Sequence, residues 1–137
     1  MLNIKVKHTL IILFAWLVFS QISIAVSADN LVTQIGLIPA TPNILKFNQK
    51  VTVNFNYDTT EAAGVRIFAR PFSGKSLTPN YAACPSPLYS LGSGTGSCTF
   101  TITSGNATVN RIRFQVWDAN LTTILFQTFV PVHYQFR

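Results

Sequence analysis

Arginines alternate with aromatic and amide side chains in two short segments of this 137-residue chain, 64–70 and 109–117. The residues concerned are Arg66, Phe68, Arg70, Arg111, Arg113, Gln115 and Trp117. Guanidinium groups bind anionic groups through paired hydrogen bonds and stack on aromatic rings. If the two segments are neighbours, these residues form one surface suited to an anionic glycan, another polyanion or a protein partner. The alternative is a solvated outer face, on which long arginine side chains shield aromatic rings.

Residues that could support catalysis or metal binding are few. Beyond residue 28 the chain has one histidine, His133, and four acids, Asp29, Asp58, Glu61 and Asp118. Asp58 and Glu61 share one predicted turn, where solvation explains them. A carboxylate pair, a catalytic triad, a zinc site or a calcium site needs a denser cluster. We therefore expect no catalytic residues, no cofactor and no metal, and the chain is not expected to be an enzyme.

Two glycine-containing segments match phosphate-binding motifs only in part. The tetrapeptide at 73–76, Ser-Gly-Lys-Ser, would need a glycine at position 69, where Ala69 stands, and a helix where Pro79 stands. The glycines of 92–96 lack the dinucleotide-binding spacing, so this segment is predicted to be a flexible hairpin loop. Glycosylation sequons begin at Asn106 and Asn120 in predicted turns, and their use depends on the source of the chain.

The first 28 residues have the pattern of a cleaved signal peptide. Lys5 and Lys7 precede ten apolar residues at 10–19, a run that fits a signal core and is short of a bilayer span. The tripeptide at 26–28, Val-Ser-Ala, suits signal peptidase and predicts a domain covering 29–137. An uncleaved anchor over 9–26 is the alternative, although polar residues interrupt it.

Cleavage would leave eight basic and four acidic residues. An exported chain with this mild positive charge is expected to meet polyanions or surfaces outside the cell rather than nucleic acid within it. The expected location is secreted or extracellular, or periplasmic in a Gram-negative bacterium. No later apolar run reaches 18 residues, so no stable membrane span is expected after signal cleavage.

Both cysteines, Cys84 and Cys98, lie in the part predicted to be exported. An even cysteine count in an oxidising compartment predicts one disulfide bond. The bridge would close a loop of about 15 residues and contribute ~3 kcal/mol in the chain-entropy model.

Period-2 alternation of apolar and polar residues predicts a chain of short strands. They cover 31–38, 50–58, 64–70, 97–103, 109–117 and 123–136. Pro131 places the last strand at a sheet edge or at a bulge. The stretch 71–87 is predicted to be irregular, with short candidate strands near 81–84 and 88–91. No segment of ten residues shows helical periodicity.

The layout of 29–137 resembles the immunoglobulin-like and fibronectin type III-like sandwich modules of exported proteins. The segments that carry the resemblance are 51–57, 64–71 and 130–136. It implies an all-β, antiparallel sandwich of about seven strands, in which the third and sixth strands are neighbours. Unlike in antibody domains, Cys84 and Cys98 are too close in sequence to bridge two sheets. The functional expectation is a secreted, non-catalytic interaction or structural module. The alternative is a carbohydrate- or polyanion-binding, adhesin-like domain.

Overall fold

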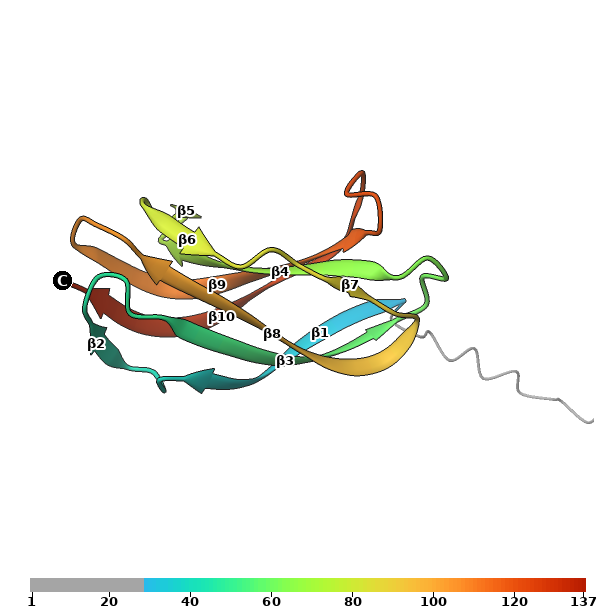
Figure 1. The fold of residues 1–137 in the computed structure, drawn as a ribbon, viewed down its shortest axis with the longest axis horizontal. Coiled ribbons are helices and arrows are strands. Elements are labelled where there is room, and N and C mark those ends of the chain that lie inside the picture. The colour runs from blue at the N-terminus through green and yellow to red at the C-terminus, as the bar shows by residue number, and fades with distance from the viewer. Residues whose placement is uncertain (1–28) are drawn as a thin grey trace, which may run out of the picture.

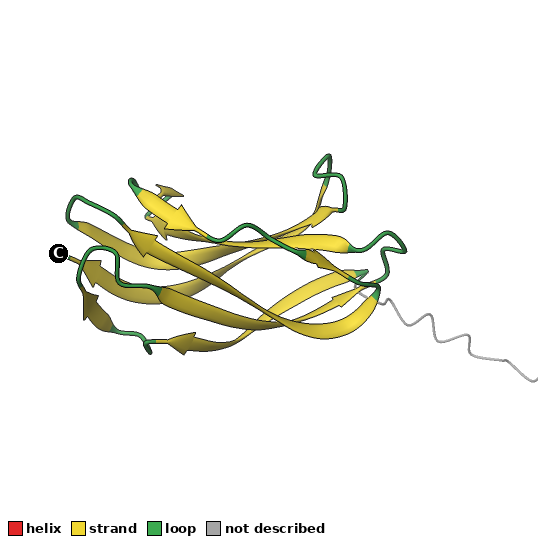
Figure 2. Ribbon diagram, in the orientation of Figure 1, coloured by secondary structure: helices red, strands yellow, loops and turns green. Residues whose placement is uncertain are grey.

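The computed structural model describes residues 29–137, so the predicted signal segment and its cleavage site lie outside the described residues. Ten strands form two sheets, and no helix occurs in the described range (Figures 1 and 2). The strands are β1 (Asn30–Ile38), β2 (Asn43–Leu45), β3 (Val51–Thr59), β4 (Val65–Ser73), β5 (Ser76–Leu77), β6 (Tyr81–Ala83), β7 (Leu88–Tyr89), β8 (Gly92–Ile102), β9 (Ala107–Asp118) and β10 (Ile124–Phe136). Within the same range, no helix could cross a membrane.

The strand order is that of an immunoglobulin constant-type sandwich. One sheet has the order β1-β3-β8-β6, and the other has the order β2-β10-β9-β4-β5, with β7 also paired to β4. All pairings are antiparallel except the parallel pairing of β10 with β2. The prediction of an antiparallel β-sandwich is therefore confirmed, with seven main strands and the short β2, β5 and β7. The third and sixth main strands, β4 and β9, are neighbours as expected.

Apolar residues that alternate along the strands fill the space between the sheets. Val51, Val53 and Phe55 of β3 are fully buried, with polar residues between them on the outer face. Phe55 meets Phe114 of the opposite sheet edge to face, with ring centroids 5.7 Å apart. Phe100 meets Tyr134 in the same way at 6.4 Å. These large side chains fix the separation of the sheets. The residues that alternate with them along each strand must therefore point outward, away from the core.

The prediction of a flexible loop at 92–96 is wrong, because these residues begin the 11-residue strand β8. This part of β8 pairs with β3 from Gly92 opposite Thr59 to Gly96 opposite Phe55. A Cβ atom on Gly96 would lie 2.6 Å from the Phe55 ring, and one on Gly94 would lie 2.6 Å from the Tyr57 hydroxyl. The glycines therefore make room for inward-facing aromatic rings.

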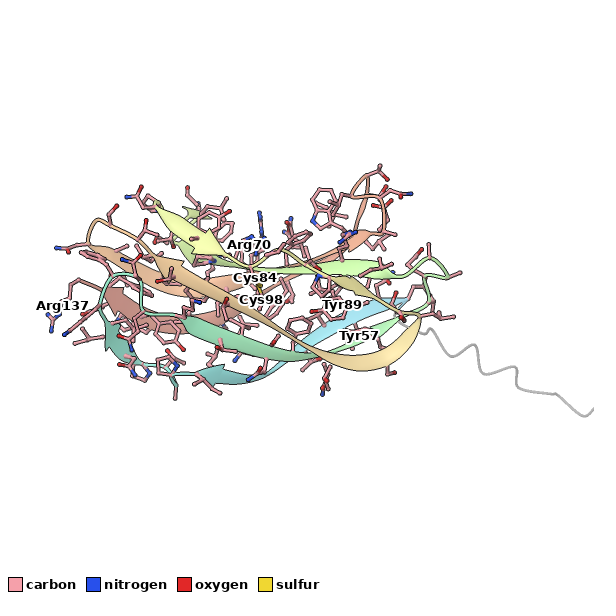
Figure 3. The ribbon with its side chains drawn as sticks, viewed as in Figure 1. Tyr57, Arg70, Cys84, Tyr89, Cys98 and Arg137 are labelled. Atoms are coloured by element: carbon pink, nitrogen blue, oxygen red, sulfur yellow. A yellow bond between two sulfur atoms is a disulfide. The ribbon has the colours of Figure 1, made fainter. Side chains whose placement is uncertain are left out.

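The predicted disulfide between Cys84 and Cys98 is present (Figure 3). Cys98 lies in β8, and Cys84 directly follows β6, the neighbouring strand of the same sheet. The Cys84 amide continues the ladder by donating to the Thr99 carbonyl at 2.9 Å. The bridge therefore fastens an edge strand to its own sheet and does not join the two sheets.

Both predicted consequences of Pro131 occur. The register between β10 and β9 shifts between Pro131 and Tyr134, which marks a bulge or irregularity. The parallel pairing with β2 begins only at Tyr134, so Pro131 lies on an edge. The prediction of an irregular stretch at 71–87 is wrong at its start, because β4 continues to Ser73. The rest of the stretch contains the short strands β5 and β6, and β7 follows it.

Candidate polyanion-binding surface

The outer face of β4 and β9 carries the predicted arginines. Arg70 lies directly opposite Arg113, and Phe68 lies opposite Gln115. Their strand neighbours point into the core, because Ile67, Ala69, Ile112 and Phe114 are buried. We call the following set the arginine face: Phe68, Arg70, Phe72, Arg111, Arg113, Gln115, Trp117 and Phe129.

Two aromatic rings support the central guanidinium groups. The Arg113 Cζ atom lies 4.7 Å from the centroid of the Phe72 ring. The Arg111 Cζ atom lies 4.4 Å from the Phe129 ring and 5.8 Å from the Phe72 ring. The two rings meet edge to face at 5.4 Å. Because each guanidinium rests on a ring, its plane is restrained and less conformational freedom is lost on binding a ligand.

Arg70 occupies the boundary between the two sheets. Its Cζ atom lies 4.9 Å from the Phe68 centroid, and its Nη1 donates to the Ala69 carbonyl at 3.1 Å. The same nitrogen is 3.8 Å from Cys98 Sγ, so Arg70 lies beside the disulfide (Figure 3). Burial lowers the pKa of Arg70, although the charge of Tyr81 and a hydrogen bond to it oppose this effect; nearby Arg113 adds to the lowering.

The Arg111 and Arg113 side chains of the arginine face are partly removed from water. The Nε atoms of Arg111 and Arg113 are buried and have no hydrogen-bond partner among residues 29–137. Burial also lowers the pKa of Arg113. An incompletely hydrated guanidinium interacts more strongly with an anion than one in bulk water.

Two open clefts mark the ends of the arginine face. The tip cleft, of about 310 Å³, is lined by Phe68, Arg70, Tyr81, Arg113, Gln115, Trp117 and Leu121. The base cleft, of about 470 Å³, is lined by Gly74, Lys75, Asn110, Arg111, Phe129 and Pro131. None of these lining residues in the described part of the chain is acidic.

Comparisons with known proteins bear only on the fold. No family model matches the chain, and no curated protein matches it. Its structure is similar to the crystal structure of a Niemann-Pick type C2 protein from the Japanese carpenter ant, with a TM-score of 0.42 and 11% sequence identity. The match covers 80% of this chain and 89% of that chain. A likeness at this level carries no information about function.

Arg66 differs from the other predicted residues of the surface. Its Nη1 donates to the Ser86 carbonyl at 2.8 Å, and its Nε donates to the Ala119 carbonyl at 3.2 Å. Arg66 therefore fastens two loops to the end of β4, and we leave it out of the arginine face. Trp117, which lies opposite Arg66, lines the tip cleft.

Gln115 is held in a fixed orientation between two polar neighbours. Its Nε2 donates to Gln127 Oε1 of β10 at 2.7 Å, and its Oε1 accepts from Trp117 Nε1 at 3.4 Å. The amide thereby connects β9 to β10, where Gln127 lies opposite Gln115, while Phe68 of β4 lies opposite Gln115 on its other side.

Sequence reasoning missed Phe72, Phe129 and Tyr81. Phe72 continues the parity of Arg70, and Phe129 shares the outward parity of the last strand, so the pattern already contained both. Tyr81 had no such signal, because its place beside Arg70 depends on how the edges of the two sheets meet. The register confirms the first two positions, with Phe72 opposite Arg111 and Phe129 opposite Arg113.

The remaining ionisable residues are scattered. His133 is exposed, and its Nε2 lies 3.4 Å from the Gln135 amide nitrogen. Asp118 accepts hydrogen bonds from Thr122 and Thr123, which lower its pKa. Among the described residues, no three histidine, cysteine or acidic side chains are grouped so as to hold a metal ion.

Proposed function

We propose that this chain is an exported, non-catalytic β-sandwich module that binds a polyanion on the arginine face. One observation carries the proposal. Three guanidinium groups, those of Arg70, Arg111 and Arg113, lie together on two neighbouring strands, and no acidic residue lines the clefts beside them. A bound anion would supply the missing negative charge.

The electrostatics of the arginine face favour a ligand over a purely structural role. Like charges directly opposite on neighbouring strands destabilise a sheet, and Arg70 faces Arg113 in this way. Burial adds a second cost, because it removes water from the charged guanidinium groups, and this desolvation lowers the pKa of both. Stacking on Phe68 and Phe72 offsets part of these costs in the free protein. An anion that bridges the guanidinium groups would remove the repulsion.

The same residues allow an alternative, in which the outer face is only solvated and the module has a structural role. Long arginine side chains would then serve to cover Phe72 and Phe129. The register of Arg70 directly opposite Arg113 counts against this alternative, because covering an apolar ring does not require two like charges on facing residues.

Export is part of the proposal. The signal pattern of residues 1–28 and a disulfide between Cys84 and Cys98 both suit an oxidising compartment. Outside the cell, a basic surface of this kind would meet acidic polysaccharides and other polyanions.

The proposed function is tested by thermal melting with and without a sulfated polysaccharide at low salt. A ligand that binds the folded state should raise the midpoint, and the rise should shrink as salt is added. In an Arg111→Ser/Arg113→Ser variant the rise should be lost, whereas the matched control Lys46→Ser/Lys50→Ser, which removes the same charge from a loop outside the face, should keep it. No rise, or equal rises in both variants, would contradict the proposal.

A further inference from the structure

The tip cleft and the base cleft repeat the same combination of side chains. Each contains at least one arginine, an aromatic ring and a primary amide. In the tip cleft these are Arg113, Trp117 and Gln115, and in the base cleft they are Arg111, Phe129 and Asn110. Two similar clefts on one face match a ligand that itself has repeating units.

Each primary amide is held by the protein and still has free hydrogen-bonding capacity. Gln115 uses one amide hydrogen for Gln127, and Asn110 accepts from the Gly74 amide at 3.0 Å through Oδ1. A primary amide has two N–H donors. Gln115 therefore keeps one donor, and Asn110 keeps both, for hydroxyl groups of a ligand.

The apolar side of the tip cleft is built by the hairpin turn between β9 and β10, which projects from the sheet at the upper right of Figure 1. Leu121 lies in this turn with a positive φ of 61° and an exposed fraction of 48%. A bulky residue rarely adopts this conformation, and such strain concentrates at ligand-binding positions. Thr122 and Thr123 hold the turn through their amide hydrogen bonds to the Asp118 carboxylate, at 2.7 and 2.8 Å.

Simple polyanions do not account for these features. A polyphosphate or an acidic peptide could satisfy the arginines, but it would leave the Leu121 and Trp117 side chains without a matching surface. A pyranose ring has an apolar face of C–H groups, equatorial hydroxyls and, in an acidic sugar, a carboxylate or sulfate. This combination corresponds to the aromatic ring, the amide and the arginine of each cleft.

We propose that the tip cleft and the base cleft are subsites for two acidic sugar units of one polysaccharide chain. This inference rests on the proposed function and specifies its ligand. Arg113 and Arg111 are two residues apart on β9, which separates their Cα atoms by about 6.8 Å along the strand. The chain would therefore run along β9, and its acidic groups would meet Arg70 and Arg113 first and then Arg111 and Lys75.

The test is a calorimetric comparison of three ligand series on the 29–137 domain, produced by export of the full chain. The ligands are galacturonate oligomers of defined length, sulfated oligosaccharides of defined length, and polyphosphates of matched charge. Affinity for at least one saccharide series should rise with length until both clefts are spanned and then level off. The saccharide series that binds identifies the acidic group as carboxylate or sulfate.

The aromatic residues separate a saccharide ligand from other polyanions. Trp117→Ala should weaken saccharide binding roughly tenfold, the size of one lost stacking contact, and should leave polyphosphate binding unchanged. Phe129→Ala also removes the ring on which Arg111 stacks, so it should weaken both kinds of binding, and saccharide binding more strongly. Leu91→Ala, which removes another exposed apolar side chain outside both clefts, should leave all ligands unaffected. Circular dichroism would establish that each variant is folded.

The outcomes distinguish this inference from the proposed function. If polyphosphate binds as tightly as the saccharides and Trp117→Ala weakens the binding of neither ligand, the acidic-sugar inference is overturned and the polyanion site stands. If a single sugar unit binds as tightly as the longest oligomer, the two-subsite arrangement is wrong. If no ligand binds, both proposals fail.

Discussion

Arg70 and Arg113 lie directly opposite each other on the neighbouring strands β4 and β9. Burial lowers the pKa of both, and the tyrosine side chain of Tyr81 acts on both in the opposite direction. A bound anion would offset the repulsion between these two facing, partly desolvated arginines, and no acidic residue lines the tip cleft that they share. This relationship distinguishes the arginine face from an ordinary basic surface.

Replacement of Gly96 should destabilise the sandwich. In Gly96→Ala the new Cβ atom would lie 2.6 Å from the buried Phe55 ring, so the ring or strand β8 must move. We expect a loss of about 1–3 kcal/mol in the free energy of unfolding, the usual cost of overpacking. Urea denaturation measures it. Gly36→Ala is the control, because its Cβ would meet nothing closer than 3.7 Å; equal stability of the two variants would contradict the packing role of Gly96.

Removal of the disulfide should weaken the fold. A Cys84→Ser/Cys98→Ser variant loses a bridge between residues 14 apart in sequence, which should cost ~3 kcal/mol of unfolding free energy. Chemical denaturation of this variant, compared with the oxidised wild-type protein, measures the loss. An unchanged midpoint would mean that the ladder between β6 and β8 alone holds the edge strand in place.

The Asp118 carboxylate should titrate below the usual range of an aspartate. The Thr122 hydroxyl and the amides of Thr123 and Thr122 bond to its charged form and lower its pKa from 3.8. Because the folded pKa is the lower one, its stabilising contribution is present at neutral pH. That contribution declines as the pH falls below the unfolded value and is gone once the pH has passed the folded value. Carbon-detected NMR titration of the side chain measures this midpoint, and a value at or above 3.8 would refute the assignment.

The exported protein should begin at Asp29. The ten apolar residues at 10–19 and the small residues at 26–28 predict cleavage after Ala28. N-terminal sequencing of secreted material tests this directly. Exported protein that still begins at Met1 would show that the segment is an anchor.

The alternation of side chains explains how much of this structure could be predicted. Buried Ile67 and Phe114 fix the parity of their strands, so Arg70 and Arg113 had to point outward once the strands were recognised. The neighbouring position of β4 and β9 followed from the sandwich layout. Both features depend on the alternation of apolar and polar residues, which is repeated over many positions and can be recognised in a single sequence.

Features that depend on one contact between distant residues were not predictable. Gly94 and Gly96 read as a loop because their role is to admit the rings of Tyr57 and Phe55 from the next strand. The carbonyl groups that Arg66 binds belong to two loops, whose approach to β4 no local pattern reveals. In each case the deciding partner lies far away in the sequence.

The most direct test of the central claim is an NMR titration of the arginine side-chain Nε–H resonances with a size-defined acidic polysaccharide at low salt. We expect saturable shifts for Arg70, Arg111 and Arg113, whose guanidinium groups lie together on the arginine face. Arg66, bound to loop carbonyls, and the exposed Arg137 should stay unchanged. Equal shifts of all five arginines, or shifts confined to Arg66 and Arg137, would contradict a binding site on the arginine face.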